Sequence, residues 1–343
     1  MTQKQVSSLP LPDFYDPKQV GEIWKLDYLK LAHRAQAFRR QHHVPFAAED
    51  RQRVCLILVD VQITFCIPGF ELFVSGRSGV GAVEDNRRLV AFMYRNLGRI
   101  TTIYPTMDTH HAMQIFHPIF WVNKTGDHPA PMTVITPEDL ASGKWAVNPV
   151  AARNLRPENP EWLRVYAQHY VRTLSNRGKY PLIVWPYHAM LGGIGYALVP
   201  AVEQAVFFHT QVRGSQAGFQ VKGDNPLTEN YSVLSPEVLS APDGKQVARK
   251  NRTFIDQLMS YDRVIVAGQA KSHCLAWTIY DLLDELEDPA LARKVYLLED
   301  CTSPVVVPGV ADYTHQADKA FQDFKDAGMH VVCSSQPMED WPA

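Results

Sequence analysis

The chain has 343 residues, and 34 lysines and arginines stand against 36 aspartates and glutamates, so the formal net charge is −2. Near-neutral charge argues against nucleic acid as the main partner, because phosphate binding needs a basic excess or a basic patch. The sequence has no run of about 18 apolar residues, and its amino terminus lacks the apolar core of a secretion signal. These features predict a cytoplasmic globular protein that does not span a membrane.

The five cysteines are widely scattered along the chain, at Cys55, Cys66, Cys274, Cys301 and Cys333. No two of them form a CxxC pair, so neither a disulfide framework nor a thiolate zinc site is indicated. An odd, scattered set of thiols is compatible with one reactive cysteine among bystanders.

Short apolar runs rich in β-branched residues recur along the chain, and most are followed by a helical stretch. They are Val54–Val59, Ile100–Tyr104, Ala205–Phe208, Val264–Ala267, Val295–Leu298 and Met329–Cys333. Continuous rather than alternating apolarity is typical of strands that are buried on both faces of a parallel sheet. The pattern predicts an α/β fold of three layers, Rossmann-like, with a central, mostly parallel six-stranded sheet flanked by helices.

Two regions depart from this alternation. Residues 1–50 precede the first strand and are expected to be a helical extension, with a helix within Gly21–Gln41. Residues 118–184 are rich in Pro, Trp and Tyr and show no strand–helix period, so we expect an insertion there. Residues 51–343 are thus predicted to form a single domain. Amphipathic helices are expected at Glu84–Leu97, Cys274–Leu286 and His315–Ala327.

Polar residues follow four of the predicted strands, at the edge where chemistry is expected in such sheets. Asp60 follows the first strand, and Asp108 with His110 follows the second. Lys222 follows the third after a loop, and Cys274 begins a helix after the fourth. Each has an ordinary alternative: a turn or cap acid, a satisfied histidine, an exposed lysine and a small core cysteine.

Cys274 is the most informative of these residues. A free thiol has a pKa of about 8.5, so little of it is thiolate at neutral pH. The positive end of a helix dipole lowers that pKa, and a neighbouring ammonium such as that of Lys222 would lower it further. Asp60 is a candidate for the base that takes the thiol proton. A catalytic role and a core role remain open on this pattern alone.

Four segments in chain order resemble the cysteine hydrolases related to nicotinamidase and isochorismatase. They are LVDVQITFCIPGFELFVSG (58–76), WPYH (185–188), KGDNPLTENYS (222–232) and AGQAKSHC (267–274). The first is similar to the family's opening segment, the second to a nicotinamidase metal-binding element, the third to its lysine segment and the fourth to its nucleophile turn. The resemblance covers residues 54–117 and 182–333.

The resemblance implies a catalytic triad of Asp60, Lys222 and Cys274. Cys274 would be the nucleophile that forms a thioester, Asp60 the general base, and Lys222 the cation that stabilises the thiolate. The backbone N–H groups of Ala270 and Cys274 would form the oxyanion hole, and the peptide bond before Ala270 would be cis. His209 directly follows an apolar run, where the lysine often sits in the family, and so competes with Lys222 for that role.

For a metal, the resemblance implies Asp108, His110 and His188 as ligands, with His117 as a weaker candidate. One carboxylate and two imidazoles would leave positions open for water and for a substrate nitrogen. Zinc is the leading expectation, iron and manganese also fit, and no organic cofactor is expected.

The substrate pocket is expected to include Gln62 and three aromatic side chains, Phe65, Trp185 and Tyr231. These aromatic residues would favour a flat or compact acyl group, although ordinary core packing is an equally good interpretation of Phe65. Thr109 and Ala189 depart from the family pattern, which usually has Trp and Cys at these positions. These departures affect the expected substrate more than the triad.

The expected function is hydrolysis of the C–N bond of a small, nicotinamide-like carboxamide, with release of ammonia and with assistance from a metal. The alternatives are a metal-free isochorismatase-like hydrolase, a hydrolase of carbamoyl or ureido compounds, and a non-catalytic binding protein on the same fold. The partner is expected to be a small-molecule amide, with no nucleic acid or membrane involved, and relatives suggest a homo-oligomer.

Overall fold

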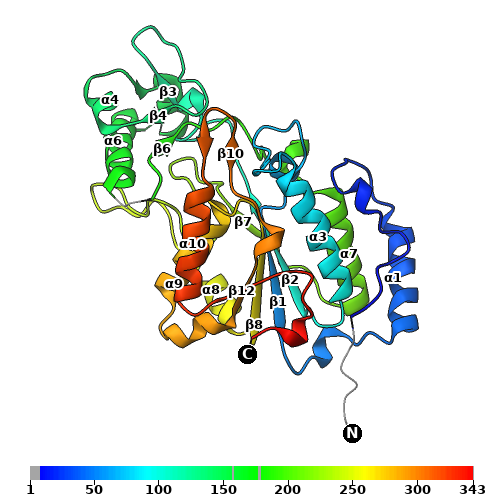
Figure 1. The fold of residues 1–343 in the computed structure, drawn as a ribbon. Helices are drawn as coiled ribbons and strands as arrows, with labels where there is room; N and C mark the ends of the chain where they lie inside the picture. The colour runs from blue at the N-terminus through cyan, green and yellow to red at the C-terminus, as the bar shows by residue number, and fades with distance from the viewer. Residues whose placement is uncertain (1–7, 157, 177–178, 343) are drawn as a thin grey trace. The chain divides into compact units, whose positions relative to one another are not determined.

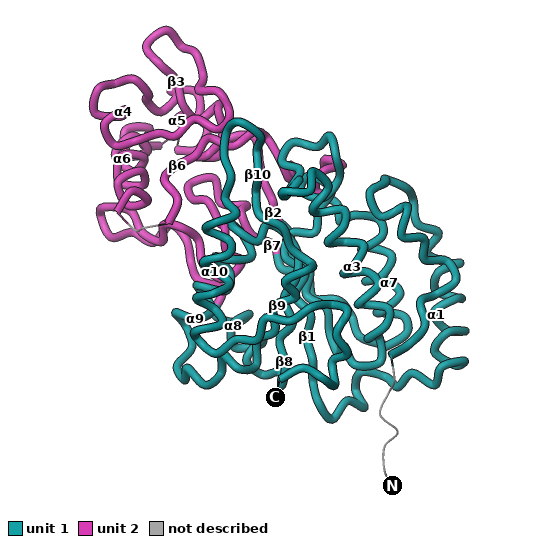
Figure 2. The backbone as a smooth tube through the Cα atoms, in the orientation of Figure 1, with its two compact units in different colours: residues 1–107, 197–220, 252–343 teal, residues 108–196, 221–251 magenta. Residues whose placement is uncertain are grey.

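The computed structural model of the chain describes residues 8–156, 158–176 and 179–342. These residues divide into two compact units, coloured separately in Figure 2. Unit 1 comprises residues 1–107, 197–220 and 252–343, and unit 2 comprises residues 108–196 and 221–251. The chain passes between the units four times, after residues 107, 196, 220 and 251. The first passage lies at the carboxyl end of β2 (Thr102–Asp108), and the third lies within β7 (Gln220–Lys222).

A six-stranded sheet with the order β12-β9-β8-β1-β2-β7 forms the framework. Its other strands are β1 (Val54–Val59), β8 (Arg263–Gly268), β9 (Val295–Leu298) and β12 (His330–Val332). The pairs β1–β2, β1–β8, β8–β9 and β9–β12 are parallel. Every residue of β1 is buried, as expected for a central parallel strand covered on both faces. The predicted fold class is therefore confirmed.

Helices cover both faces of the sheet in unit 1, which gives three layers (Figure 1). The helices α3, α7 and α1 lie on one side and pack in that order, and α9 and α10 pack together on the other side. The helices of this unit are α1 (Tyr28–His42), α2 (Ile63–Cys66), α3 (Gly81–Arg95), α7 (Pro200–Arg213), α8 (Arg252–Met259), α9 (Cys274–Glu285) and α10 (Thr314–Asp326). A short hairpin, β10 (Val306–Val307) with β11 (Ala311–Asp312), precedes α10.

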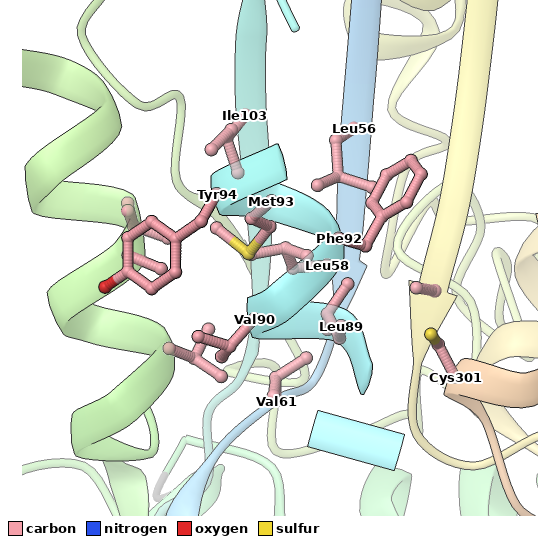
Figure 3. Packing of buried hydrophobic residues seen from close by; sticks show 14 of the residues in the cluster. Leu56, Leu58, Val61, Leu89, Val90, Phe92, Met93, Tyr94, Ile103 and Cys301 are labelled. Carbon is pink, nitrogen blue, oxygen red and sulfur yellow. The ribbon is translucent and has the colours of Figure 1, made fainter. Parts of the chain in front are cut away.

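The apolar core of unit 1 lies between the sheet and α3. Figure 3 shows Leu56 and Leu58 of β1 against Leu89, Val90 and other residues of α3. All four of these side chains are fully buried. This packing fixes the direction in which β1 delivers the residue that follows it, Asp60.

One predicted strand is wrong. Residues 205–208 lie inside helix α7, which begins at Pro200 and is followed by Gly214 in the left-handed conformation. The helix is buried on more than one face because it lies between α1 and α3, so its apolar run is continuous. A short continuous apolar run does not distinguish a buried strand from a buried helix. The sixth strand is instead β7, which has only three residues.

Unit 2 contains the whole region predicted to be an insertion, residues 118–184. Two short antiparallel pairs occur here, β3 with β5 and β4 with β6. The elements are β3 (Trp121–Val122), β4 (Val134–Ile135), β5 (Ala146–Val147), β6 (Leu182–Ile183), α4 (Pro137–Ala141), α5 (Pro149–Leu155) and α6 (Pro160–Asn176). Among the residues that the structure describes, no helix combines the length and the apolarity needed to cross a bilayer.

Helix α6 anchors the loop that follows β7. Its buried face carries Tyr166 and Tyr170, four residues apart. The Tyr166 hydroxyl donates to the carbonyl of Leu227, and the Tyr170 hydroxyl accepts from the backbone N–H of Glu229. The loop after Lys222 is therefore tied to a regular element within the same unit.

Candidate active site

Asp60 lies directly after β1, in unit 1, with a positive φ of 46° and no exposed surface. Its backbone N–H donates to the hydroxyl oxygen of Thr106, at 3.0 Å. The same hydroxyl donates to Oδ1 of Asp60, at 2.5 Å. Thr106 belongs to the neighbouring strand β2, so two hydrogen bonds across the sheet fix the orientation of the carboxylate. Thr106 was not predicted as a site residue, because a threonine within a strand carries no distinguishing signal in the sequence.

The turn between β8 and α9 carries the predicted nucleophile. The peptide bond between Gln269 and Ala270 is cis, as the resemblance implied, and Gly268 has a φ of 115°. A Cβ atom at Gly268 would lie 2.1 Å from the carbonyl oxygen of Val59, so only glycine fits between the strands. Helix α9 then begins at Cys274 itself.

Two backbone N–H groups of this turn were predicted to form an oxyanion hole. The N–H of Ala270 has no hydrogen-bond acceptor among the described residues. Cys274 occupies the first turn of α9, where backbone N–H groups do not donate within the helix. A developing negative charge near this turn would meet the N–H of Ala270 as a donor that is already in place.

The other four cysteines differ from Cys274 in their surroundings. Cys55, Cys66 and Cys301 are completely buried, and burial raises the pKa of each of these thiols. Cys333 is partly exposed, and its pKa is also raised by burial and by nearby acids. Cys274 is partly exposed and stands at a helix amino terminus.

Unit 2 contains the predicted metal ligands. Asp108, His110 and His188 are all buried, and one ligand atom of each lies within 4.8 Å of the others. Nε2 of His110 lies 2.7 Å from Oδ2 of Asp108, and Nε2 of His188 lies 3.5 Å from the same oxygen. A carboxylate and two imidazoles that converge in a buried place make a suitable donor set for zinc or another divalent transition metal.

Backbone carbonyls orient both ligand imidazoles. Nδ1 of His110 lies 3.2 Å from the carbonyl oxygen of Gly223, and Nδ1 of His188 lies 2.7 Å from that of Pro186. Each carbonyl can accept a hydrogen bond from Nδ1–H, and Nε2 of each ring faces Oδ2 of Asp108. Such outer partners are what hold metal-ligating histidines in place.

His117, the weaker metal candidate, is oriented in the same way. Its Nδ1 lies 3.0 Å from the carbonyl oxygen of His111, and its Nε2 is buried with no partner among the described residues. Its ring centroid lies 5.7 Å from that of His110 and 6.2 Å from that of His188. Burial and the neighbouring histidines lower the pKa of His117 to about 3, so the ring is neutral. A buried lone pair without a partner beside this cluster is the feature expected of a further metal ligand.

Lys222 lies beside these candidate ligands. Its ammonium group donates to Oδ1 of Asp108 at 2.8 Å and to the carbonyl of Asn230 at 3.0 Å. The family resemblance implied a role for Lys222 beside the thiolate and did not predict this ion pair with Asp108. The competing candidate, His209, lies in α7 of unit 1, where its Nε2–H donates to the carbonyl of Ile100. His209 therefore has a structural role.

The predicted pocket residues are divided between the two units. Gln62 and Phe65 are buried in unit 1, where Gln62 pairs with Leu198. Trp185 and Tyr231 are buried in unit 2. Glu229, which lies in the loop that contains Tyr231, is buried and was not predicted as a site residue. Burial and the nearby Glu237 raise the pKa of its carboxyl well above the ordinary value. Acids in such polar loops are exposed by default, so the sequence carried no signal for it.

Comparison with solved structures finds this fold in hydrolases. The yeast nicotinamidase bound to the inhibitor nicotinaldehyde aligns with a TM-score of 0.50 and 19% identity, over 82% of this chain and 99% of that chain. A nicotinamidase and pyrazinamidase from Acinetobacter baumanii has a TM-score of 0.49 and 17% identity, over 84% and 99%. An isochorismatase-like hydrolase from Alkaliphilus metalliredigens has a TM-score of 0.43 and 12% identity, over 86% and 99%.

Comparison with family models finds no match, and comparison with the sequences of curated proteins finds none. At identities below 20%, the likeness to solved structures concerns the fold rather than the reaction. The resemblance expected from four sequence segments is confirmed at the level of the fold, which the chain shares with the yeast nicotinamidase.

Proposed function

We propose that the protein is a cysteine-dependent amidohydrolase that cleaves a small, nicotinamide-like carboxamide and releases ammonia. The observation that carries the proposal is the position of Cys274, a partly exposed thiol in the first turn of α9, after a turn with the N–H of Ala270 available. Nicotinamidases among the structural neighbours support an amide as the substrate.

In the proposed reaction, Asp60 takes the proton of the Cys274 thiol, and Lys222 stabilises the thiolate. The sulfur attacks the carbonyl carbon, and the N–H groups of Ala270 and Cys274 bind the oxygen that becomes negative. The carbon–nitrogen bond then breaks, and Asp60 returns its proton to the departing nitrogen, which leaves as ammonia. Water attacks the resulting thioester, and the carboxylate product leaves while the thiol is restored.

We further propose that Asp108, His110 and His188 hold a divalent metal ion, with His117 as an additional ligand. The convergent Nε2 atoms and the unpartnered Nε2 of His117 fit such an ion. When bound, the ion supplies Lewis-acid binding of a donor atom of the substrate, such as a ring nitrogen. Zinc is the leading choice, because one carboxylate and several imidazoles match its usual ligands.

The direct test is ammonia release by the purified protein from nicotinamide, pyrazinamide, maleamate, N-carbamoyl amino acids and biuret, with and without a chelator. We expect Cys274→Ala to abolish hydrolysis while the protein stays folded, and Cys333→Ala, which removes the other partly exposed thiol, to retain activity. Near-parental activity of Cys274→Ala would overturn the mechanism. Release from the ureido compounds alone, unaffected by the chelator, would favour a metal-free hydrolase instead.

A further inference from the structure

A buried polar network in unit 1 reaches the nucleophile turn from outside the residues assigned above. Gln269, whose peptide bond with Ala270 carries a proposed oxyanion donor, is 1% exposed. Its side-chain Nε2 donates to Oδ2 of Asp85 at 2.9 Å. Asp85 lies in α3 and is 2% exposed. The two residues are 184 positions apart in the sequence.

The amide of Gln269 is held from its other end as well. Its Oε1 accepts from the backbone N–H of Ser303 at 3.3 Å, and the carbonyl of Ser303 accepts from the N–H of Lys271 at 2.8 Å. The backbone N–H of Gln269 donates to the carbonyl of Val59 at 2.7 Å. The turn is therefore connected to three elements: strand β1, helix α3 and the segment that contains Ser303.

A buried carboxylate at this position is costly unless it is well bonded. Burial raises the pKa of Asp85, while hydrogen bonds from Ser303 and Gln269 and the charge of Arg88 oppose that rise. The half-exposed side chain of Arg88 donates to Oδ1 of Asp85 at 2.9 Å, which leaves Oδ2 for Gln269. A neutral apolar side chain at position 85 could fill the same space, but only a hydrogen-bond acceptor at this position fixes the direction of the Gln269 amide.

We infer that Asp85 is a positioning residue for catalysis, acting through Gln269 to aim the Ala270 N–H at the oxyanion of the tetrahedral intermediate. This inference rests on the proposed function, because it requires a carbonyl substrate that Cys274 attacks. Displacement of a catalytic donor by about 1 Å can cost on the order of 100-fold in rate. The effect is expected in kcat, since the oxyanion exists only after attack.

The test reverses the hydrogen bond between the two side chains. Gln269→Glu places a second carboxylate against Asp85, and we expect kcat for ammonia release to fall by roughly 100-fold with KM changed by less than about threefold. In the double variant Asp85→Asn/Gln269→Glu, the new asparagine amide donates to the new carboxylate, and we expect kcat to recover to within about fivefold. Glu84→Gln, which removes one charge from the neighbouring position of α3, serves as the control.

Two further measurements separate positioning from general stability. Nicotinaldehyde is an aldehyde to which the Cys274 thiol would add, with the thiol proton transferred to the carbonyl oxygen, and the adduct would place an oxygen where the oxyanion would form. We expect its inhibition constant to rise in Gln269→Glu in parallel with the loss of kcat. Alkylation of Cys274 by iodoacetamide needs no oxyanion hole, so its rate should stay within about threefold of the parental rate.

The inference is overturned if Gln269→Glu keeps its kcat, if the double variant does not recover, or if alkylation falls as much as hydrolysis. If Gln269→Glu does not fold, Gln269→Met removes both side-chain hydrogen bonds at similar volume, and the same loss of kcat is expected. A parental protein that neither hydrolyses an amide nor binds nicotinaldehyde would overturn the proposed function itself. An active parental protein with unaffected variants would overturn the positioning role alone.

Discussion

The ammonium nitrogen of Lys222 lies 2.8 Å from Oδ1 of Asp108, and both side chains are buried. The other oxygen of this carboxylate faces Nε2 of His110, at 2.7 Å. Burial alone would raise the pKa of Asp108, but the charges of His110 and Lys222 and the hydrogen bonds outweigh it and hold the pKa well below its ordinary value. Asp108 is thus an ionised carboxylate that connects the lysine to the candidate metal ligands.

The first prediction concerns this ion pair. Lys222→Met leaves a buried carboxylate without its cation, and breaking a buried pair typically costs about 3–5 kcal/mol. We expect the metal-free variant to lose free energy of unfolding of this order, as measured by denaturation in the presence of EDTA. Zinc should raise the Tm of the variant more than that of the parental protein, because the ion neutralises the same carboxylate.

A matched control is available in unit 2. Lys144 pairs with Asp139 at 2.8 Å, but its side chain is 60% exposed. Lys144→Met should cost less than about 1 kcal/mol, since exposed pairs contribute little. Equal losses in the two variants would contradict the importance of burial, and an identical zinc response of Lys222→Met and parental protein would separate the lysine from the metal site.

The second prediction distinguishes the histidines of unit 2. His188→Ala removes one of the convergent ligands, and we expect bound zinc to fall to background in metal analysis after dialysis. His117→Ala removes the lone pair that faces the cluster, and we expect zinc affinity to fall by roughly 10- to 100-fold in a chelator competition. The control is His111→Ala, because His111 is exposed next to His110. Unchanged affinity in His117→Ala would exclude it as a ligand.

The sequence predicted the strands of the sheet well where a continuous apolar run ends sharply at polar residues. The bounds of β1 and β9 match the predicted runs, because continuously apolar strands of four to six residues end abruptly in polar residues. The strand predicted at residues 205–208 is wrong, because a helix covered by other helices has the same continuous apolar sequence as a buried strand. The edge strand β7 was missed because it has three residues, and Val221 is half exposed.

For the site, the sequence predicted residue identities but not their partners. Asp108, His110 and His188 were predicted from the resemblance to a known family, and the structure brings them together. The carbonyls that orient the imidazoles carry no signal, since every residue has one. The bond between Gln269 and Asp85 joins residues 184 positions apart, and only the packing of α3 beside β8 brings them into contact.

The third prediction tests the close approach at the nucleophile turn. Gly268→Ala would place a Cβ atom 2.1 Å from the carbonyl of Val59, so we expect loss of folded protein or destabilisation by more than about 3 kcal/mol. Gly69→Ala is the control, because Gly69 also has a positive φ, of 88°, but nothing lies within 4 Å of its Cβ position. It should cost only the local strain, about 1–2 kcal/mol, as measured by chemical denaturation. Similar losses in both variants would show that backbone conformation, rather than contact, limits position 268.

The fourth prediction concerns stability at acidic pH. Burial and the charge of Arg213 lower the pKa of His209 to about 4, although the hydrogen bond to the Ile100 carbonyl opposes the shift. Below pH 6.5 the unfolded chain protonates this imidazole, whereas the folded protein does not until the pH approaches 4. The unfolded state therefore binds more protons in this window, and the free energy of unfolding falls as the pH is lowered from 6.5 to 4. The contribution of His209 is on the order of 3 kcal/mol over the window.

His209→Gln keeps a side-chain N–H that can donate to the Ile100 carbonyl, but removes the titration. We expect urea unfolding of this variant to show a smaller loss of stability between pH 6.5 and 4 than the parental protein. His117 and His273 have pKa values lowered to about 3 and should maintain the rest of the slope. His33→Gln, at an exposed position of α1, should leave the slope unchanged. If His209→Gln retains the parental slope, then His209 is not held neutral in the folded state, and the acid sensitivity arises from other groups.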